Sequence, residues 1–188
     1  MNRNKIPLLG YALLGLLHQV SLSGYGVRKM FSSSPMGSYS DSPGAIYPAL
    51  QRLEEAGLIR GRVEDSSGLR RKKIYSPTNA GIAALKQWLK NPVTHEEVVR
   101  GVNELILRFS FMDPVIGEAA TLQFLRALQI ELQAYIPTLR EYLNSYGTKM
   151  SQSGILALES GVRGYETLLE WCKHAITTYD GKAKGGSS

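Results

Sequence analysis

The chain has 188 residues, of which 43% are hydrophobic, and its formal net charge is +6. This length allows one compact core with a smaller second unit. The single cysteine, Cys172, excludes an internal disulfide and a cysteine-based metal site. The apolar run 8–17 is too short to cross a bilayer, which takes about 20 residues, and it lacks a signal-peptide cleavage site, so we expect a cytoplasmic protein.

The positive charge is concentrated in the first half of the chain. Residues 1–91 hold 13 basic and 5 acidic side chains, whereas residues 92–188 hold 9 and 11. A basic unit joined to a mildly acidic one predicts a polyanionic partner for the first. A soluble protein with a basic surface is the alternative.

Two helices are predicted before residue 32. Apolar side chains three and four positions apart predict an amphipathic helix over 6–20. Ser23 is placed to cap a second, short helix that ends near Phe31. The stretch 32–40 is rich in Ser, Gly and Pro, which is typical of a loop.

A third helix is predicted to begin at Ser42-Pro43. Ser42 supplies a cap oxygen, and Pro43 at the first helical position loses no needed hydrogen bond. The helix is expected to continue to Ala56 and to end at Gly57, a residue suited to a left-handed cap.

Two strands and a further helix follow. The composition predicts strands over 58–63 and 71–76 joined by a turn at 65–68. Thr78 is placed to cap a helix that ends near Asn91. Three helices, a two-stranded hairpin and a helix are the order of a winged helix-turn-helix, so residues 1–91 are predicted to be a DNA-binding domain of that fold.

Residues 92–180 are predicted to form an α-helical dimerisation or effector domain, which makes the whole protein mainly α with a small β-hairpin. A Thr-x-x-Glu capping box predicts a helix over 94–111, and an Asp-Pro pair predicts the start of another over 113–145. A last helix spans at least 155–176. The Gly-, Ser- and Lys-rich end, 181–188, is expected to be disordered.

Apolar side chains in the last two helices alternate three and four positions apart, as in coiled coils. These stripes either pack on each other within one chain or offer a face to a second subunit. We expect a homodimer, with interface candidates Leu122, Leu125, Leu132, Leu139, Ile155, Leu158, Val162, Tyr165 and Leu169.

One face of the third helix is predicted to be buried and the opposite face to contact DNA. At about 100° per residue, Ile46, Ala49, Leu50 and Leu53 share the buried face. Small residues on the other face allow close approach to a major groove, where Gln and Arg recognise base edges. The DNA-contact candidates are Ser42, Pro43, Gly44, Tyr47, Pro48, Gln51 and Arg52. Two alternatives stay open: Tyr47 packs partly against the second helix, and Arg52 interacts only with Glu55 or with solvent.

Four consecutive cations, Arg70, Arg71, Lys72 and Lys73, follow the hairpin turn. Like charges in a row repel each other, so this arrangement favours contact with phosphates or the minor groove over a merely solvated hairpin. Weaker candidates for backbone contacts are Arg28, Lys29, Arg60 and Arg62.

These residues resemble the PadR-like family of bacterial transcriptional regulators over about residues 8–90. The matching stretches are Leu14-Gly15-Leu16-Leu17, Leu22-Ser23-Gly24-Tyr25, Ser42-Pro43-Gly44-Ala45-Ile46-Tyr47-Pro48-Ala49-Leu50, Leu53-Glu54, Gly57-Leu58-Ile59, and Lys73-Ile74-Tyr75-Ser76-Pro77-Thr78 with Gly81. Ala45 stands where the family often has Thr, and Pro77 where it often has Leu.

The resemblance implies a homodimer that binds a palindromic operator and usually represses transcription. It also places Tyr25, at the start of the second helix, among the DNA-contact candidates. The looser similarity of the C-terminal part implies that its helices form the dimer interface together with the first helix.

No catalytic constellation is present in the sequence, so we predict that the chain is not an enzyme and holds no cofactor or metal. A small-molecule effector is expected between the two domains, where the aromatic candidates are Trp88, Tyr135 and Trp171, with Tyr142 and Tyr165 also considered. Ordinary packing is the alternative for each of them. A protein-docking module, with the basic hairpin meeting an acidic partner, is the alternative to DNA binding.

Overall fold

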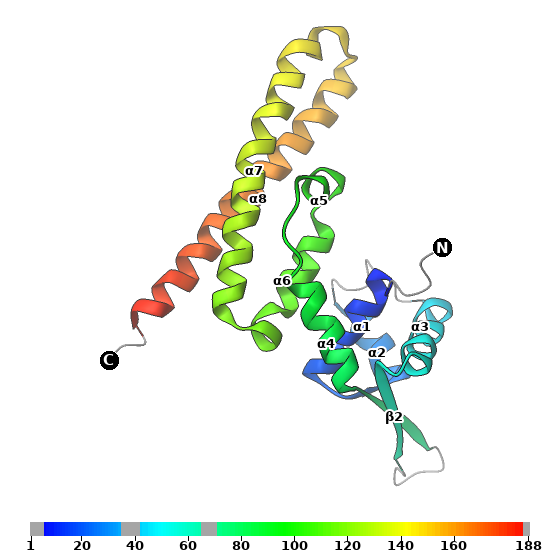
Figure 1. Cartoon of the computed structure of the whole chain (residues 1–188). Coiled ribbons are helices and arrows are strands. Elements are labelled where there is room, and N and C mark those ends of the chain that lie inside the picture. Colours follow the sequence, from blue (N-terminus) through cyan, green and yellow to red (C-terminus); the bar gives the residue numbers. More distant parts are fainter. Residues whose placement is uncertain (1–5, 35–41, 65–70, 186–188) are drawn as a thin grey trace. The chain divides into compact units, whose positions relative to one another are not determined.

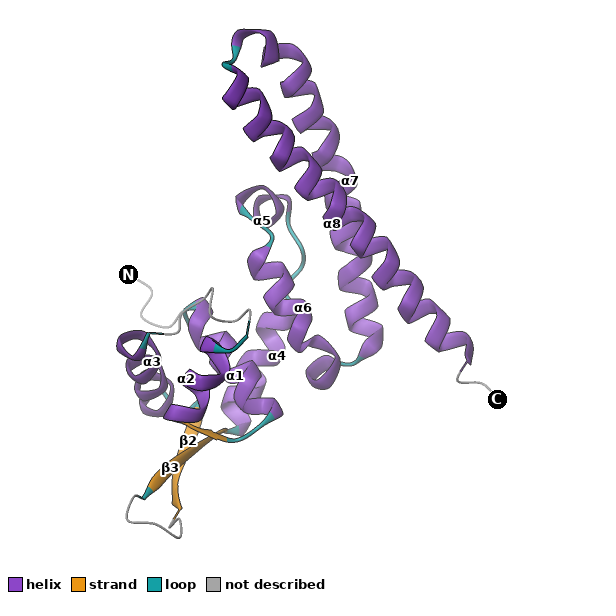
Figure 2. Ribbon diagram, turned by 180° about the vertical axis from the view of Figure 1, so that it is seen from behind, coloured by secondary structure: helices purple, strands orange, loops and turns teal. Residues whose placement is uncertain are grey.

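The computed structural model describes residues 6–34, 42–64 and 71–185. The chain divides into two compact units, Met1–Lys90 and Asn91–Ser188, each shown in Figures 1 and 2. Within the described ranges, no helix is both long enough and apolar enough to cross a membrane.

The first unit contains four helices and three short strands among its described residues. In chain order they are α1 (Leu8–Gln19), β1 (Leu22–Ser23), α2 (Gly24–Ser32), α3 (Pro43–Glu55), β2 (Ile59–Glu64), β3 (Lys72–Pro77) and α4 (Asn79–Leu89). This is the predicted order of helices and hairpin strands, with one strand added.

The added strand, β1, makes the sheet three-stranded, with the antiparallel order β1-β3-β2. Leu22 pairs with Tyr75, and Ile59 pairs with Pro77 at the start of the β2–β3 hairpin. The two residues of β1 are too few to show the alternation of apolar and polar side chains that predicts a strand. Only the pairing with β3 reveals β1. The hairpin projects beyond the helices of its unit (Figure 1).

Helix ends in the first unit follow the predicted caps. The Ser23 side chain accepts a hydrogen bond from the backbone N–H of Gly26 at 3.1 Å, and Thr78 accepts one from Gly81 at 3.1 Å. Gly57 follows α3 with a φ of +70°, a conformation that costs glycine little.

The core of the first unit is apolar and draws on each of its four helices. Leu13 and Leu14 of α1, Ile46 of α3 and Leu85 of α4 have no exposed surface. The predicted buried face of α3 is confirmed, because Ala49, Leu50 and Leu53 are also buried. This packing leaves the opposite face of α3 exposed.

The second unit is helical over its described residues. Its elements are α5 (His95–Arg100), α6 (Asn103–Ile116), α7 (Glu118–Tyr146), the 3₁₀ turn η2 (Gly147–Lys149) and α8 (Gln152–Gly185). Both views show α7 and α8 running side by side as a long antiparallel pair (Figures 1 and 2).

Two predicted helix boundaries in the second unit are wrong. The capping box at Thr94 is present, but its helix ends at Arg100 instead of continuing to 111, since Gly101 takes a φ of +128°. Asp113 and Pro114 lie inside α6 and do not start α7. Gly117, with a φ of +85°, separates α6 from α7. Both glycines adopt positive φ angles, which end a helix. The capping residues at other positions in the sequence give no sign of these two breaks.

The end of the chain also differs from the prediction of a disordered segment over 181–188. Helix α8 continues to Gly185, so the prediction is wrong over 181–185, and 186–188 lie outside the described residues. Once a long helix is nucleated, each added residue gains one hydrogen bond, so propagation past a single glycine costs little.

Arg108 joins several segments of the second unit. Its side chain has no exposed surface and donates to Glu97 Oε1 at 2.9 Å and to the carbonyl of Asn91. Its guanidinium also lies 5.1 Å from the ring centroid of Phe124. Burial lowers the pKa of Arg108, although Glu97 opposes that shift. The start of the unit, α5, α6 and α7 are therefore held together by one charged side chain.

Candidate nucleic-acid interface

The N-terminus of α3 has the geometry that the sequence predicted. The Ser42 hydroxyl accepts a hydrogen bond from the backbone N–H of Gly44 at 3.2 Å, and Pro43 occupies the first helical position. The first backbone N–H groups of a helix carry partial positive charge and point outward along the axis. This end of α3 is therefore suited to a phosphate.

The exposed face of α3 carries the predicted polar candidates. Gly44, Pro48, Gln51 and Arg52 are all exposed. Gln51 Nε2 donates to Glu55 Oε1 at 2.8 Å, so Glu55 has Gln51 as its partner. An exposed pair of this kind can exchange its partner for a base edge at small cost. The exposed Arg52 agrees with the alternative that it interacts with solvent, and its contact with DNA stays a prediction.

Tyr47 is fixed by contact with the start of α2. A Cβ added at Gly24 would lie 2.5 Å from Tyr47 Cε1, so the ring packs directly on the Gly24 backbone. Tyr47 nevertheless keeps 44% of its surface exposed, and the neighbouring Tyr25 keeps 67%. Tyr47 therefore packs on α2, as one alternative held, while part of its surface stays exposed; its contact with DNA stays a prediction.

One of the hairpin cations is held by an ion pair with α3. Arg71, Lys72 and Lys73 are all exposed. Lys73 also forms an ion pair with Glu54 of α3, with Nζ 2.7 Å from Oε2. Arg70 and the turn at 65–68 lie outside the described residues.

The weaker candidates lie on the same unit. Arg28, Lys29 and Arg62 are exposed. Arg60 Nε donates to Ser76 Oγ at 3.4 Å, across the β2–β3 pair. Sequence reasoning missed Gly24, Glu54 and Gly61 as residues that shape this surface. Glu54 and Lys73 are 19 positions apart, and no periodicity connects such a pair.

The candidate dimer residues are partly used inside the chain. Leu125 and Leu132 of α7 have no exposed surface, and Val162 of α8 is buried. The others, half-buried in this structure, are Leu122, Leu139, Ile155, Leu158, Tyr165 and Leu169. The predicted stripes thus face each other along α7 and α8, which was one of the two alternatives.

The three effector candidates belong to different units. Trp88 is buried in the first unit, where it stacks on Tyr11 with ring centroids 4.6 Å apart. In the second unit, Tyr135 contacts Tyr165 edge to face at 5.1 Å, and Trp171 contacts Phe109 in the same way at 5.2 Å. Tyr142 is half exposed and contacts Tyr146.

An apolar groove of about 590 Å³ lies between α6 and α8 of the second unit. Trp171 and Tyr165 are the aromatic residues that line it. The other lining residues are Val102, Asn103, Ile106, Gly161, Gly164, Thr167 and Leu168.

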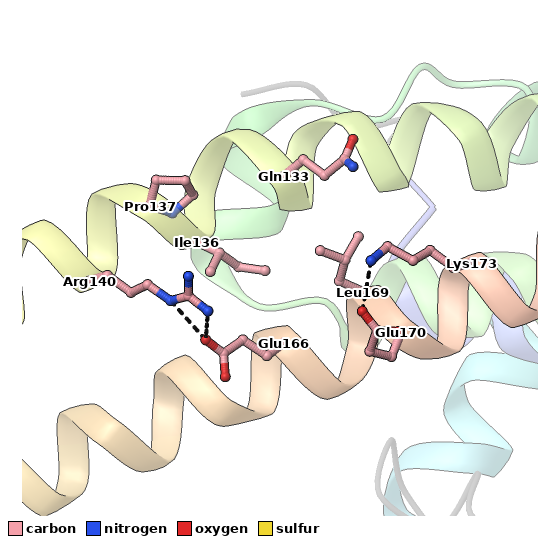
Figure 3. A pocket seen from close by; sticks show the side chains of 8 residues that line it. All are labelled: Gln133, Ile136, Pro137, Arg140, Glu166, Leu169, Glu170 and Lys173. Atoms are coloured by element: carbon pink, nitrogen blue, oxygen red, sulfur yellow. Dashed lines mark hydrogen bonds and ion pairs between the residues drawn. The ribbon is translucent and has the colours of Figure 1, made fainter.

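A second cleft, of about 440 Å³, lies between α7 and α8 beside Pro137 (Figure 3). Its charges are paired: Arg140 binds Glu166, and Lys173 Nζ lies 2.7 Å from Glu170 Oε1. Because both cations already have carboxylate partners, this cleft offers no free charge to an ionic ligand. Among the described residues, no group of His, Cys, Asp and Glu side chains could hold a metal ion.

Three helices, a small antiparallel sheet and a projecting hairpin define the first unit as a winged helix-turn-helix. The sequence profile described as "Transcriptional regulator PadR-like family" matches residues 13–87 of it. The first unit is therefore similar to the members of this family over most of its length. The family consists of transcriptional regulators, which agrees with the prediction that the chain is not an enzyme.

Two curated relatives are similar to the chain as well. The chain is 29% identical over 163 residues to the "Negative transcriptional regulator PadR" of Bacillus subtilis (strain 168), covering 86% of each protein. It is 32% identical over 91 residues to the "Transcriptional regulator YqjI" of Escherichia coli (strain K12), covering 48% of this chain and 40% of that protein.

Solved structures of the B. subtilis PadR are also similar. The complex of that protein with operator DNA aligns at 22% identity and a TM-score of 0.42, over 92% of this chain and 99% of that one. Its complex with p-coumaric acid aligns at 22% identity and a TM-score of 0.39, over 93% and 99%.

Proposed function

We propose that this regulator binds double-stranded DNA through α3 and the β2–β3 hairpin and represses transcription from a palindromic operator. The observation that carries the proposal is the exposed face of α3. It combines a capped helix N-terminus with Gln51 and Arg52, while the apolar face of the same helix is anchored in the core. A rigid helix of this kind is what entry into a major groove requires.

Each part of the surface has its own task in this proposal. The N–H groups at the start of α3 bind a phosphate and set the register of the helix on the duplex. Gln51 and Arg52 contact base edges, and Lys72 and Arg71 contact the backbone beside the groove. Repression follows when the bound protein covers a promoter.

Binding to duplexes selected from random DNA, measured as a function of salt, tests this proposal. We expect a palindromic site with half-sites about one helical turn apart. Affinity should fall on the order of 10³-fold between 50 and 200 mM salt. Salt-independent binding, or no enrichment of any sequence, would contradict the proposal.

Two variants with matched substitutions separate hairpin contacts from general charge. Lys72→Ala should lower affinity for all duplexes and reduce the salt slope by about one phosphate contact. Lys86→Ala removes the same charge from the exposed side of α4 and should leave the slope unchanged. Equal effects of the two variants would mean that only net charge matters.

We further propose that the protein is a homodimer that uses a second stripe on α8. Ala157, Gly161, Gly164, Leu168 and Trp171 alternate four and three positions apart, on a different face from the stripe that packs against α7. A Cβ added at Gly161 or Gly164 meets nothing within 4 Å, so a partner helix has room to approach closely. Gly161, Gly164, Leu168 and Trp171 of this stripe also line the apolar groove beside α6.

Sedimentation of a charged variant tests the dimer. Gly161→Glu with Gly164→Glu places two carboxylates on open helix surface, so the chain should stay folded while the dimer dissociates. Thr177→Glu, exposed on another face of α8, is the control and should remain dimeric. A dimer that survives in the double variant would exclude this face.

For release from DNA, we propose an aromatic effector that binds beside Tyr165 and Trp171 in the same groove. The groove volume of about 590 Å³ suits a drug-sized molecule, and such a ligand would compete with the partner helix. The probe is p-coumaric acid, the ligand in the B. subtilis PadR complex. It should weaken both operator binding and dimerisation, and no effect up to about 1 mM would contradict this part.

A further inference from the structure

Glu54 at the end of α3 holds both strands of the hairpin with its two carboxylate oxygens. Oε1 accepts the backbone N–H of Gly61 on β2 at 3.1 Å. Oε2 accepts from Lys73 Nζ on β3 at 2.7 Å. One side chain therefore connects the helix proposed to contact bases with the hairpin proposed to contact the backbone.

Gly61 makes this connection sterically possible. A Cβ at position 61 would stand 2.1 Å from Lys73 Cε and 2.8 Å from Glu54 Oε1. Gly61 pairs with Tyr75 in the sheet, and Lys73 pairs with Val63, so the Lys73 stem crosses the β2 backbone diagonally at the glycine. Glycine is needed here for space and not for an unusual backbone angle, since its φ is not positive.

The rest of the attachment between α3 and β2 lies at the base of the hairpin. Leu58 N donates to Leu53 O at 2.8 Å, and Ile59 is buried in the core. Gly61 and Lys73 lie further along the strands, where Val63 and Glu64 are already exposed. Beyond this base, the hairpin is held by the pairing of β1 with Ile74 and Tyr75 of β3 and by the Glu54 link, which joins it to α3.

Lys73 is held in place electrostatically. Its hydrogen bond to Glu54 raises the pKa of Lys73, so the lysine stays charged at neutral pH and its charge is matched by the carboxylate. The two side chains keep 43% and 31% of their surface exposed. An ion pair this exposed contributes little to stability, so its effect is on geometry.

We propose that Glu54, Gly61 and Lys73 form a positioning link that sets the angle between α3 and the hairpin, and thereby the discrimination between operator and other DNA. This inference rests on the proposed DNA binding. It assigns Lys73 a different role from Lys72, because Lys73 positions the hairpin and is not a phosphate contact.

Glu54→Gln tests the link because two explanations predict opposite results. If Glu54 acts only through its charge, its removal strengthens binding to every duplex alike. If it positions the hairpin, the ratio of affinities for the selected duplex and for a shuffled duplex falls about tenfold, the usual weight of one misaligned base contact. Glu64→Gln on β2, outside the link, is the matched control and should leave the ratio unchanged.

Lys73 variants complete the experiment. Lys73→Met should lower the ratio as Glu54→Gln does, with no further loss in the double variant and no change in salt slope. Glu54→Lys combined with Lys73→Glu should recover part of the ratio. A salt slope reduced by about one contact in Lys73→Met would show that Lys73 binds phosphate and would overturn the proposal.

Hydrogen exchange of the DNA-free protein gives a readout that does not depend on DNA binding. In Glu54→Gln, amides of β2 and β3 should exchange faster while those of α1 stay protected. Unchanged exchange in the hairpin would overturn the link. If the wild-type chain binds all duplexes alike but the hairpin amides exchange faster in Glu54→Gln, the proposed function fails and the link between α3 and the hairpin stands.

Discussion

Cys172 shows how burial decides the chemistry of a single side chain. It has no exposed surface, and its thiol donates to the carbonyl of Leu125 at 3.1 Å. Burial raises the pKa of the Cys172 thiol to about 11, although the backbone N–H of Gln129 acts in the opposite direction. The interpretation of Cys172 as a small buried apolar residue is thus favoured over a redox switch.

Labelling with Ellman's reagent at pH 8 tests this interpretation. The folded protein should react very slowly, because only about one thiol in a thousand is a thiolate there and none is accessible. Unfolded protein and a Thr177→Cys variant should react at once. Rapid labelling of folded wild type would contradict the assignment.

The raised pKa of Cys172 also predicts how stability depends on pH. Because the unfolded thiol loses its proton near pH 9.0 and the folded one near 11, the free energy of unfolding should fall over this interval.

Arg108 is the largest fully buried side chain among the described residues, and its charge is paired with Glu97. Arg108→Met should lower the free energy of unfolding of the second unit by about 3 kcal/mol, because Glu97 and the carbonyl of Asn91 lose their donor. Arg100→Met is the control, since its exposed pair with Glu96 contributes about 0.5 kcal/mol or less. Equal denaturation midpoints for the two variants would show that the buried pair contributes nothing.

Individual contacts of the candidate interface were predictable to different degrees. Helical periodicity correctly placed the exposed face of α3, because the period of an α-helix is known in advance. The pairing of Lys73 with Glu54 was not predictable, since it depends on how far β3 lies from α3 and on an open path over Gly61. Side chains that are adjacent only in space leave no mark on local sequence patterns.

Among the helices and strands, caps with a chemical signature were predicted better than breaks made by glycine. Ser42, Thr78 and Thr94 each supply a side-chain oxygen at the expected helix start. The breaks at Gly101 and Gly117 were missed because glycine is also tolerated inside helices, as at Gly161 and Gly164 of α8. Only the path of the chain distinguishes these two uses of the residue.

Substitution of Gly117 tests the break between α6 and α7. Gly117→Ala should lower the free energy of unfolding by roughly 1–3 kcal/mol, because an L-residue is strained at a φ of +85° and a ψ of 162°. Gly181→Ala in α8, where a Cβ meets nothing within 4 Å, should be neutral or slightly stabilising. Thermal melting followed by circular dichroism measures both, and a neutral Gly117→Ala would show that the two helices can join without strain.

The whole chain combines two units with separate cores, divided between Lys90 and Asn91. The net positive charge belongs to residues 1–91, and the long α7–α8 pair belongs to the second unit. This division of charge and helix pairing agrees with a proposed separation of tasks, in which one unit binds DNA and the other pairs two copies.

Separate expression of the units tests that division. A fragment starting at Asn91 should remain helical and dimeric and should not bind DNA. A fragment ending at Lys90 should bind the selected duplex at least about 100-fold more weakly than the full chain, because it loses the second half-site contact. Circular dichroism, sedimentation and DNA titration give the three readouts, and full affinity in the shorter fragment would show that pairing of copies does not support binding.

The sequence by itself determined the winged helix-turn-helix, the PadR-like resemblance, the exposed face of α3 and the basic character of the first unit. These properties depend on short-range periodicity, caps and charge counts, all of which are local. Only the tertiary structure decided that β1 joins the sheet, that the predicted dimer stripe packs α7 on α8, and that Lys73 binds Glu54. Each of these depends on segments that are distant in sequence and adjacent in space, so no local pattern specifies them.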